Sequence, residues 1–288
     1  MRIFFTTILV FVATWAIQAQ GEFSGGFKAG LNFNNFQTDA LEPGETYSTS
    51  VGFHIGDTFI YSVTDLFGVK GEFIYNQKGV QYTYEGDSYY TLYLRDLDAP
   101  FYATGTRKSD FNVTNSYLDI PLMVYYKIGK LELEAGVNAG ILVGSRGSGA
   151  VTFSGTAQNG TPISSFTANV DYAYYNNDRG RDALIAAEPF DLASGVIALR
   201  PVTVGAYYEA ADNDENKYNT IDFGLNAGLA FFISKGLYIG ARLNYGLTDV
   251  TNEAQDLSQV RLLPGNKYET RNDNDQNLSI QTSVGFRF

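Results

Sequence analysis

Residues Leu278–Phe288, LSIQTSVGFRF, decide the fold of this chain. Apolar and polar side chains alternate along the whole stretch, which is the pattern of a β-strand between an apolar medium and a polar interior. One face carries Leu278, Ile280, Thr282, Val284, Phe286 and Phe288. The other face carries Ser279, Gln281, Ser283, Gly285 and Arg287. The stretch therefore predicts a strand in the wall of a barrel whose apolar face points outward.

The alternation stops on an aromatic residue, Phe288, with nothing after it. A terminal strand with an outward aromatic last residue resembles the closing strand of bacterial outer-membrane β-barrels, whose C-terminus serves as an assembly signal. The resemblance implies an outer-membrane location, in contact with membrane lipid and lipopolysaccharide.

The amino-terminal end predicts the same location. Met1 and Arg2 precede an apolar run from Ile3 to Ile17, and a small residue, Ala19, follows at a plausible cleavage site. This pattern is typical of a secretory signal peptide. At roughly 15 apolar residues the run is shorter than the roughly 20 that a transmembrane helix needs. We expect a signal peptide at residues 1–19 and an outer-membrane barrel domain at residues 20–288.

The composition excludes several classes of protein. The 288 residues are 44% hydrophobic and 15% aromatic with 30 Gly, which favours β structure. The chain has no Cys, so it is neither a lipid-anchored lipoprotein nor a disulfide scaffold. A net charge of −11 argues against nucleic acid as a partner and suits solvated loops.

Seven further segments show the same alternation. They are Phe27–Phe33, Val51–Gly56, Phe67–Asn76 with an extension toward Tyr84, Leu118–Ile128, Leu131–Val143, Ile221–Ile233 and Leu237–Leu247. With the terminal segment they predict an all-β fold, an eight-stranded antiparallel up-and-down transmembrane barrel. The gaps between segments run about 15, 5, 30, 2, 75, 3 and 25 residues, which matches short periplasmic turns and long extracellular loops. The terminal strand must then pair with the first. A soluble lipocalin-like barrel is the alternative, with its apolar face inward.

Three stretches carry a family resemblance. They are SYLDIPLMVYYKIGKLELEAGVNAGILVG from Ser116 to Gly144, DFGLNAGLAFFISKGLYIGARLNYGLTDV from Asp222 to Val250, and GGFKAGLNFNNF from Gly25 to Phe36. They resemble the PorT-like outer-membrane β-barrel family, which is common in Bacteroidetes. Ile120-Pro121 and the run Ala241–Gly246 are the most specific matches. The resemblance implies an eight-stranded outer-membrane barrel, with a role in secretion or gliding for a few members and no assigned activity for most.

The inward face of the predicted strands is unusually charged. It carries Lys28, Lys70, Glu72, Asp119, Lys127, Glu132, Glu134, Asp222, Arg242 and Arg287, five cations against five carboxylates. Eight strands enclose a lumen that side chains can fill, so we expect these residues to neutralise one another in a structural network. The alternative is a narrow ion path or a small-solute site. Pro121 lacks an N–H and predicts a bulge or a bend in its strand.

The sequence gives little support for a catalytic or a metal-binding site. His54 is the only His, and no Ser or carboxylate partner can be assigned to it from spacing, so we expect a hydrogen-bonded filler of the lumen. Two acidic patterns, Asp212-Asp214-Asn216 and Asp273-Asp275-Asn277, resemble the start of a calcium loop. In the first, Lys217 and Phe223 occupy the Gly and Glu positions of that motif. We interpret both patterns as solvated loops, and we expect no catalytic residue, cofactor or metal.

The longest predicted loop, residues 146–219, is not a plain polar tether. It carries Tyr172, Tyr174, Tyr175, Tyr207 and Tyr208 and apolar runs at 183–187 and 196–199. Part of it should fold as strand extensions above the membrane or as a cap on the mouth, and exposed tyrosines would suit a partner. We expect a non-enzymatic barrel whose extracellular loops bind a protein or glycan partner. The alternatives are a lipid-modifying enzyme and a narrow channel.

Overall fold

The computed structural model describes residues 21–288 except 98–99, 177, 194 and 212. The predicted signal peptide, residues 1–19, lies outside the described residues. The strands are β1 (Glu22–Gln37), β2 (Glu45–Ser48), β3 (Ser50–Ser62), β4 (Phe67–Leu94), β5 (Pro100–Ile128), β6 (Leu131–Ala157), β7 (Pro162–Ala173), β8 (Leu184–Ala193), β9 (Val196–Val204), β10 (Ile221–Phe232), β11 (Leu237–Gly246), β12 (Leu257–Leu263), β13 (Lys267–Thr270) and β14 (Gln276–Arg287). A 3₁₀ turn, η1 (Gly180–Ala183), precedes β8. The fold is all-β and mostly antiparallel.

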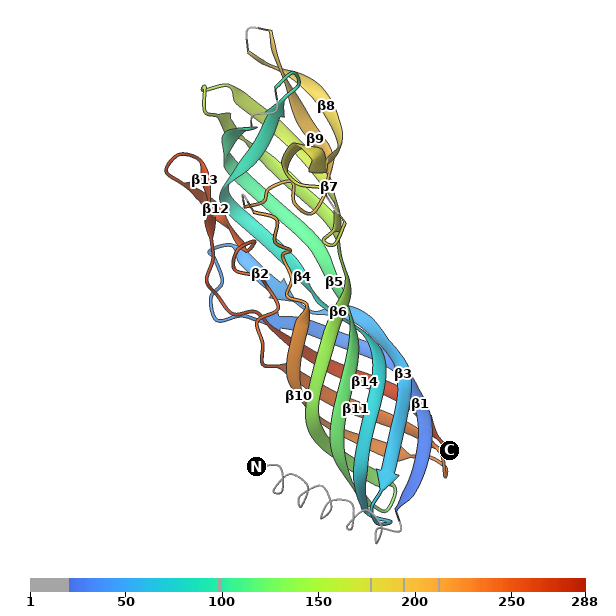
Figure 1. Ribbon diagram of the computed structural model, residues 1–288. Coiled ribbons are helices and arrows are strands. Elements are labelled where there is room, and N and C mark those ends of the chain that lie inside the picture. Colours follow the sequence, from blue (N-terminus) through green and yellow to red (C-terminus); the bar gives the residue numbers. More distant parts are fainter. Residues whose placement is uncertain (1–20, 98–99, 177, 194, 212) are drawn as a thin grey trace, which may run out of the picture.

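Hydrogen-bonded pairs close the main sheet into a ring (Figure 1). The order around this ring is β1, β3, β4, β5, β6, β10, β11 and β14, and β14 pairs back to β1. Phe27 lies opposite Phe286 and Phe33 opposite Ile280. The predicted pairing of the last segment with the first is therefore confirmed. We call this ring the wall.

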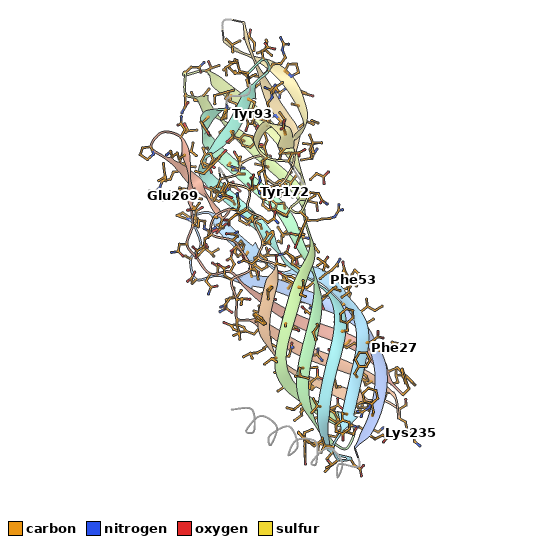
Figure 2. All side chains as sticks on the ribbon, in the orientation of Figure 1. Phe27, Phe53, Tyr93, Tyr172, Lys235 and Glu269 are labelled. Carbon is orange, nitrogen blue, oxygen red and sulfur yellow. The ribbon has the colours of Figure 1, made fainter. Side chains whose placement is uncertain are left out.

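Apolar side chains cover the outside of the wall. Figure 2 shows Phe27 and Phe53 pointing away from it, and the outward residues of every wall strand follow the predicted parity. Examples are Leu31, Ile55, Phe73, Leu122, Val137, Leu225, Ile239 and Val284, each about half exposed. A lipocalin-like barrel would bury such residues, so that alternative is wrong. In the described part of the chain no helix is long and apolar enough to cross a membrane.

Strands β4, β5 and β6 continue far beyond the wall. They contain 28, 29 and 27 residues, whereas about 9–11 suffice for a strand to cross a bilayer. Above the wall they form a second ring with β7 and β9, which returns to β4 through Tyr93 opposite Leu199. β8 pairs with β9 alone, at the end of this sheet. We call the second ring together with β8 the head (Figure 1).

The head has the opposite polarity to the wall. Along β5, the outward residue Val124 in the wall is apolar, whereas the outward residues Thr106 and Lys108 in the head are polar and exposed. Inward, the wall buries Asp119, whereas the head buries an apolar core around Leu92, Phe153 and other aromatic and aliphatic residues. The change coincides with a register shift between β5 and β6 at Ser116/Tyr117. A strand surrounded by water buries its apolar face, and a strand surrounded by hydrocarbon exposes it.

This inversion explains the differences from the predicted boundaries. The gap expected between Tyr84 and Leu118 is mostly strand, the outer halves of β4 and β5. Residues 146–219 contain the end of β6 and all of β7, β8 and β9, so the expectation that part of this segment folds as strand extensions is confirmed. Of the bulge or bend expected at Pro121, the bulge is absent, because the β4–β5 register does not change there. The ladder is interrupted beside Pro121, between the pairs Gly71–Leu122 and Ile74–Asp119, as a residue without an N–H predicts.

The boundary between the two media can be tested on a single strand. We expect Val124→Lys to destabilise the protein in lipid by about 2–4 kcal/mol if it lies near the bilayer midplane, because the ammonium would face hydrocarbon. Thr106→Lys, outward on the same strand but in the head, should change the free energy of unfolding by less than about 0.5 kcal/mol. Urea unfolding in lipid vesicles measures both. Equal tolerance of the two lysines would contradict the boundary.

Candidate functional site

Ion pairs fill the lower half of the lumen. Arg242 on β11 lies at their centre, because Nη1 is 2.7 Å from Glu72 Oε2 and Nη2 is 2.6 Å from Glu134 Oε1. Lys28 Nζ is 2.8 Å from the same Glu72 oxygen. Lys70 Nζ continues the network to Glu134 at 2.7 Å and to Glu132 at 2.6 Å, and Arg287 Nη1 reaches Glu132 at 3.4 Å. These seven residues come from β1, β4, β6, β11 and β14, so the network crosses the lumen.

A second group of charges lies closer to the head. Lys78 Nζ is 2.8 Å from Asp222 Oδ2 and 3.3 Å from Asp119 Oδ2, and all three side chains are buried. The sequence prediction omitted Lys78. Its signal was present, because Lys78 continues the even-numbered inward series of Lys70, Glu72 and Asn76 on β4.

The tenth predicted residue, Lys127, lies apart from these groups. Its ammonium is 5.6 Å from the Tyr125 ring centroid and 5.7 Å from that of Phe232, at the end of the barrel opposite the head. Among the described residues it makes no ion pair. With Lys78 in its place, the paired set still contains five cations and five carboxylates.

His54 has the polar surroundings of a lumen residue. It is buried on β3, and its Nδ1 lies 2.6 Å from Asn32 Oδ1. Asn32 in turn donates to Asn76 Oδ1 at 2.7 Å. The His54 contact is to an amide, so it supplies neither the serine nor the carboxylate that a hydrolase would need.

A small cavity of about 100 Å³ lies between the lumen and the head core. Tyrosines line much of the cavity, and at its surface Arg107 Nη2 donates a hydrogen bond to Glu209 Oε2 at 2.6 Å. The space holds several water molecules but is smaller than the roughly 300–1,000 Å³ of small-molecule sites. The expected exposed tyrosine surface is wrong: Tyr174, Tyr207 and Tyr208 are buried around this cavity, and Tyr175 is the exposed exception among the five predicted tyrosines.

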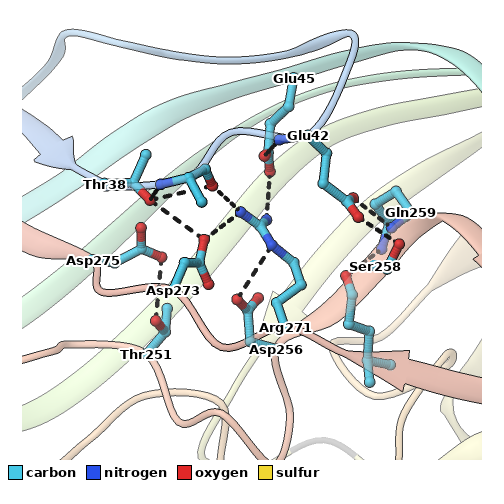
Figure 3. A network of polar contacts seen from close by, with 12 residues as sticks. Thr38, Glu42, Glu45, Thr251, Asp256, Ser258, Gln259, Arg271, Asp273 and Asp275 are labelled. Atoms are coloured by element: carbon cyan, nitrogen blue, oxygen red, sulfur yellow. Dashed lines mark hydrogen bonds and ion pairs between the residues drawn. The ribbon is translucent and has the colours of Figure 1, made fainter.

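The two acidic patterns differ in their exposure to solvent. Asp214 is fully exposed, as expected of a solvated loop, and Asp212 lies outside the described residues. For Asp273, Asp275 and Asn277 the solvated interpretation is wrong, because all three are buried. Figure 3 shows Asp273 and Asp275 beside Asp256. Sequence spacing missed Asp256, which folds against them from the start of β12.

The central network should carry much of the wall's stability. We expect Arg242→Met to destabilise the protein by about 3–5 kcal/mol, because Glu72 and Glu134 would keep buried charge without their main partner. Lys127→Met is the matched control and should cost less than about 1 kcal/mol, since that ammonium contacts rings. Urea unfolding of both variants measures this, and equal losses would contradict the assignment.

Several solved outer-membrane proteins align with most of this chain at low sequence identity. Ail, the attachment invasion locus protein of Yersinia pestis, is 11% identical with a TM-score of 0.36, covering 93% of this chain and 99% of Ail. Neisserial surface protein A is 10% identical with a TM-score of 0.38 and coverages of 93% and 99%. OprG from Pseudomonas aeruginosa is 10% identical with a TM-score of 0.31 and coverages of 93% and 95%. Values this low carry no functional information, and no curated protein matches the chain.

A family model gives the assignment that these structures do not. The model described as outer membrane protein beta-barrel domain matches residues 18–252, well over half of the chain. The matched region contains the wall strands from β1 to β11 and the whole head. The chain therefore belongs to the outer membrane protein beta-barrel domain family.

Proposed function

We propose that this protein is a non-enzymatic, eight-stranded transmembrane barrel of the PorT-like kind that displays the head to a partner outside the cell. The observation that carries the proposal is the head itself. A chain that only had to cross the membrane would need neither 27–29-residue strands nor a second apolar core. An ordered structure outside the membrane can hold a binding surface in a fixed geometry.

The orientation follows from the connections. The turns at residues 63–66, 129–130 and 233–236 are short, and they lie at the end of the wall that also carries the C-terminus (Figure 1). Short turns face the periplasm in bacterial barrels, so the head faces outward. This orientation agrees with export by the signal peptide proposed at residues 1–19.

The lumen does not favour the channel alternative. Paired charges from opposite sides of the wall cross it, and moving an ion through would require breaking buried pairs such as Arg242–Glu72. The lipid-modifying alternative lacks a supported base, since His54 contacts Asn32. The binding function therefore belongs to the surface of the head.

The exposed edge of β8 is the best-placed binding surface. β8 pairs with β9 on one side, and in the described part of the chain its other edge has no strand partner. Ile185 is 54% exposed, and Ala186 and Ala187 beside it are exposed as well. Glu188, Pro189, Asp191 and the irregular pairing at Leu184–Ala187 oppose the addition of a whole strand to this edge. The exposed apolar side chains at 185–187 instead suit side-chain contact with a protein partner rather than a glycan.

The membrane assignment has a direct test. We expect the protein to fractionate with the outer membrane and to migrate differently on gels before and after heating, because a closed barrel resists detergent until it is boiled. Recovery in the soluble periplasmic fraction would contradict the transmembrane barrel.

The partner can be sought without removing the loop. Deleting residues 146–219 would remove half of β6 and the head core, so point variants are better suited. We expect Ile185→Lys/Ala187→Lys to abolish capture of a specific partner from cell-surface extracts, since two ammonium groups would crowd the free edge. Thr156→Lys/Ser164→Lys, exposed on β6 and β7, is the matched control and should capture normally. Equal capture by both variants would exclude the β8 edge as the docking site.

A further inference from the structure

Three buried carboxylates converge at the base of the β12–β13 hairpin. Asp256 directly precedes β12, and Asp273 and Asp275 lie between β13 and β14. One oxygen from each carboxylate lies within 4.8 Å of the other two. The residues are 4%, 6% and 0% exposed in this order, so water does not solvate their charge. Neither the family assignment nor the proposed function uses them.

Each carboxylate accepts hydrogen bonds through one oxygen only, and the dashed line to Asp256 in Figure 3 is its longer ion pair with Arg271. Lys217 Nζ donates to Asp256 Oδ1 at 3.1 Å, and Thr251 Oγ1 donates to Asp275 Oδ2 at 3.2 Å. Asp273 Oδ2 accepts from Arg271 and from Thr38 Oγ1. The second oxygens, Asp256 Oδ2, Asp273 Oδ1 and Asp275 Oδ1, are buried without a hydrogen-bond donor in the described chain. Buried acceptors of this kind usually have a partner, so three together point to a missing one.

The charge around these oxygens points to a cation. Arg271 is shared with Glu45 and Ala40, and its Nε is 3.8 Å from Asp256 Oδ2, too far for a hydrogen bond. Within hydrogen-bond or ion-pair contact of this site, the described residues supply five carboxylates and two cations: Glu45, Asp249, Asp256, Asp273 and Asp275 against Lys217 and Arg271. Five carboxylates against two cations leave this site short of positive charge.

We infer that Asp256, Asp273 and Asp275 bind one Ca²⁺ ion, each through one carboxylate oxygen. All three ligands are hard carboxylate oxygens, which suit Ca²⁺ and Mg²⁺ rather than zinc. Two oxygens on opposite sides of a Ca²⁺ at about 2.4 Å lie about 4.8 Å apart, so three oxygens within 4.8 Å of one another can share one Ca²⁺ ion. The flexible coordination of Ca²⁺ suits three carboxylates from separate segments better than the regular octahedron that Mg²⁺ needs. Water and nearby backbone carbonyls would complete the shell.

The ion would fasten the hairpin to the rim of the wall. Asp256 and Asp273 flank the β12–β13 hairpin, and Asp275 leads directly into β14. The same site reaches Thr38 in the connection after β1, through Asp273. A bound Ca²⁺ would therefore add a fixed link beyond the pairs Leu257–Thr270 and Gln37–Gln276, where the β12–β13 and β1–β14 ladders end. The inference holds whatever partner the head binds.

Calcium titration of the full-length protein tests the inference. The protein is purified in detergent, stripped with EDTA, dialysed, and titrated with CaCl₂ by calorimetry. We expect one Ca²⁺ per chain, with a Kd on the order of 10⁻⁴–10⁻³ M, as in extracellular modules. Asp275→Asn and, separately, Asp256→Asn should weaken binding at least tenfold. Asp214→Asn, in the exposed acidic pattern, is the matched control and should bind normally. A heat-shifted gel band shows that each variant is folded.

Proteolysis provides the second measurement. Calcium should slow cleavage at the hairpin tip, residues 264–266, in the wild type and not in Asp275→Asn. The absence of calorimetric binding up to 10 mM Ca²⁺, about tenfold above that range, would overturn the inference. A proton shared between the carboxyl groups would then be the explanation of the site. Loss of binding in Asp214→Asn with normal binding in Asp275→Asn would overturn the location. Equal or tighter binding of Mg²⁺ would overturn the choice of ion, and binding without protection of the hairpin would overturn the fastening role.

Discussion

The medium that touches the outer face of each strand determines the rest of this structure. The wall exposes apolar side chains and encloses charges, and the head does the reverse with the same three strands, β4, β5 and β6. Backbone hydrogen bonds are indifferent to this change, so the ladders run through it with one register shift at Ser116/Tyr117. Everything that is polar in the wall must consequently be satisfied inside it.

That requirement explains why the lumen contains networks and not isolated charges. Arg242 can be buried because its guanidinium serves two carboxylates at once, and Glu72 is shared in turn with Lys28. Closer to the head, Lys78 likewise pairs with two carboxylates, those of Asp119 and Asp222. Charge balance is achieved over the whole set and not within single pairs. The carboxylates at the hairpin base lack such a balance, which distinguishes them from the lumen.

Sequence patterns predicted the wall well because its rule is strict: parity assigned the outward face of every wall strand and the closure of β14 on β1. Parity says nothing about depth, so the pairs of Lys70 or Arg242 could not be named in advance. The outer halves of β4 and β5 were missed as strand because the polarity of their faces inverts in the head, and the tyrosines of residues 146–219 were interpreted as surface for the same reason. Asp273 and Asp275 meet Asp256 only in the folded chain, since Asp256 is nearly 20 residues away in a different connection.

The unbroken passage of β4, β5 and β6 from wall to head has a mechanical consequence. Leu94 stands 16 residues beyond Lys78 on one continuous strand, roughly 50 Å at about 3.3 Å per residue. No linker separates the two rings, so the tip is held at a constant height and angle above the bilayer. A force applied there is transmitted along three strands at once and loads their hydrogen bonds in shear. A partner bound at the tip, as proposed above, would therefore be held at a set distance from the membrane.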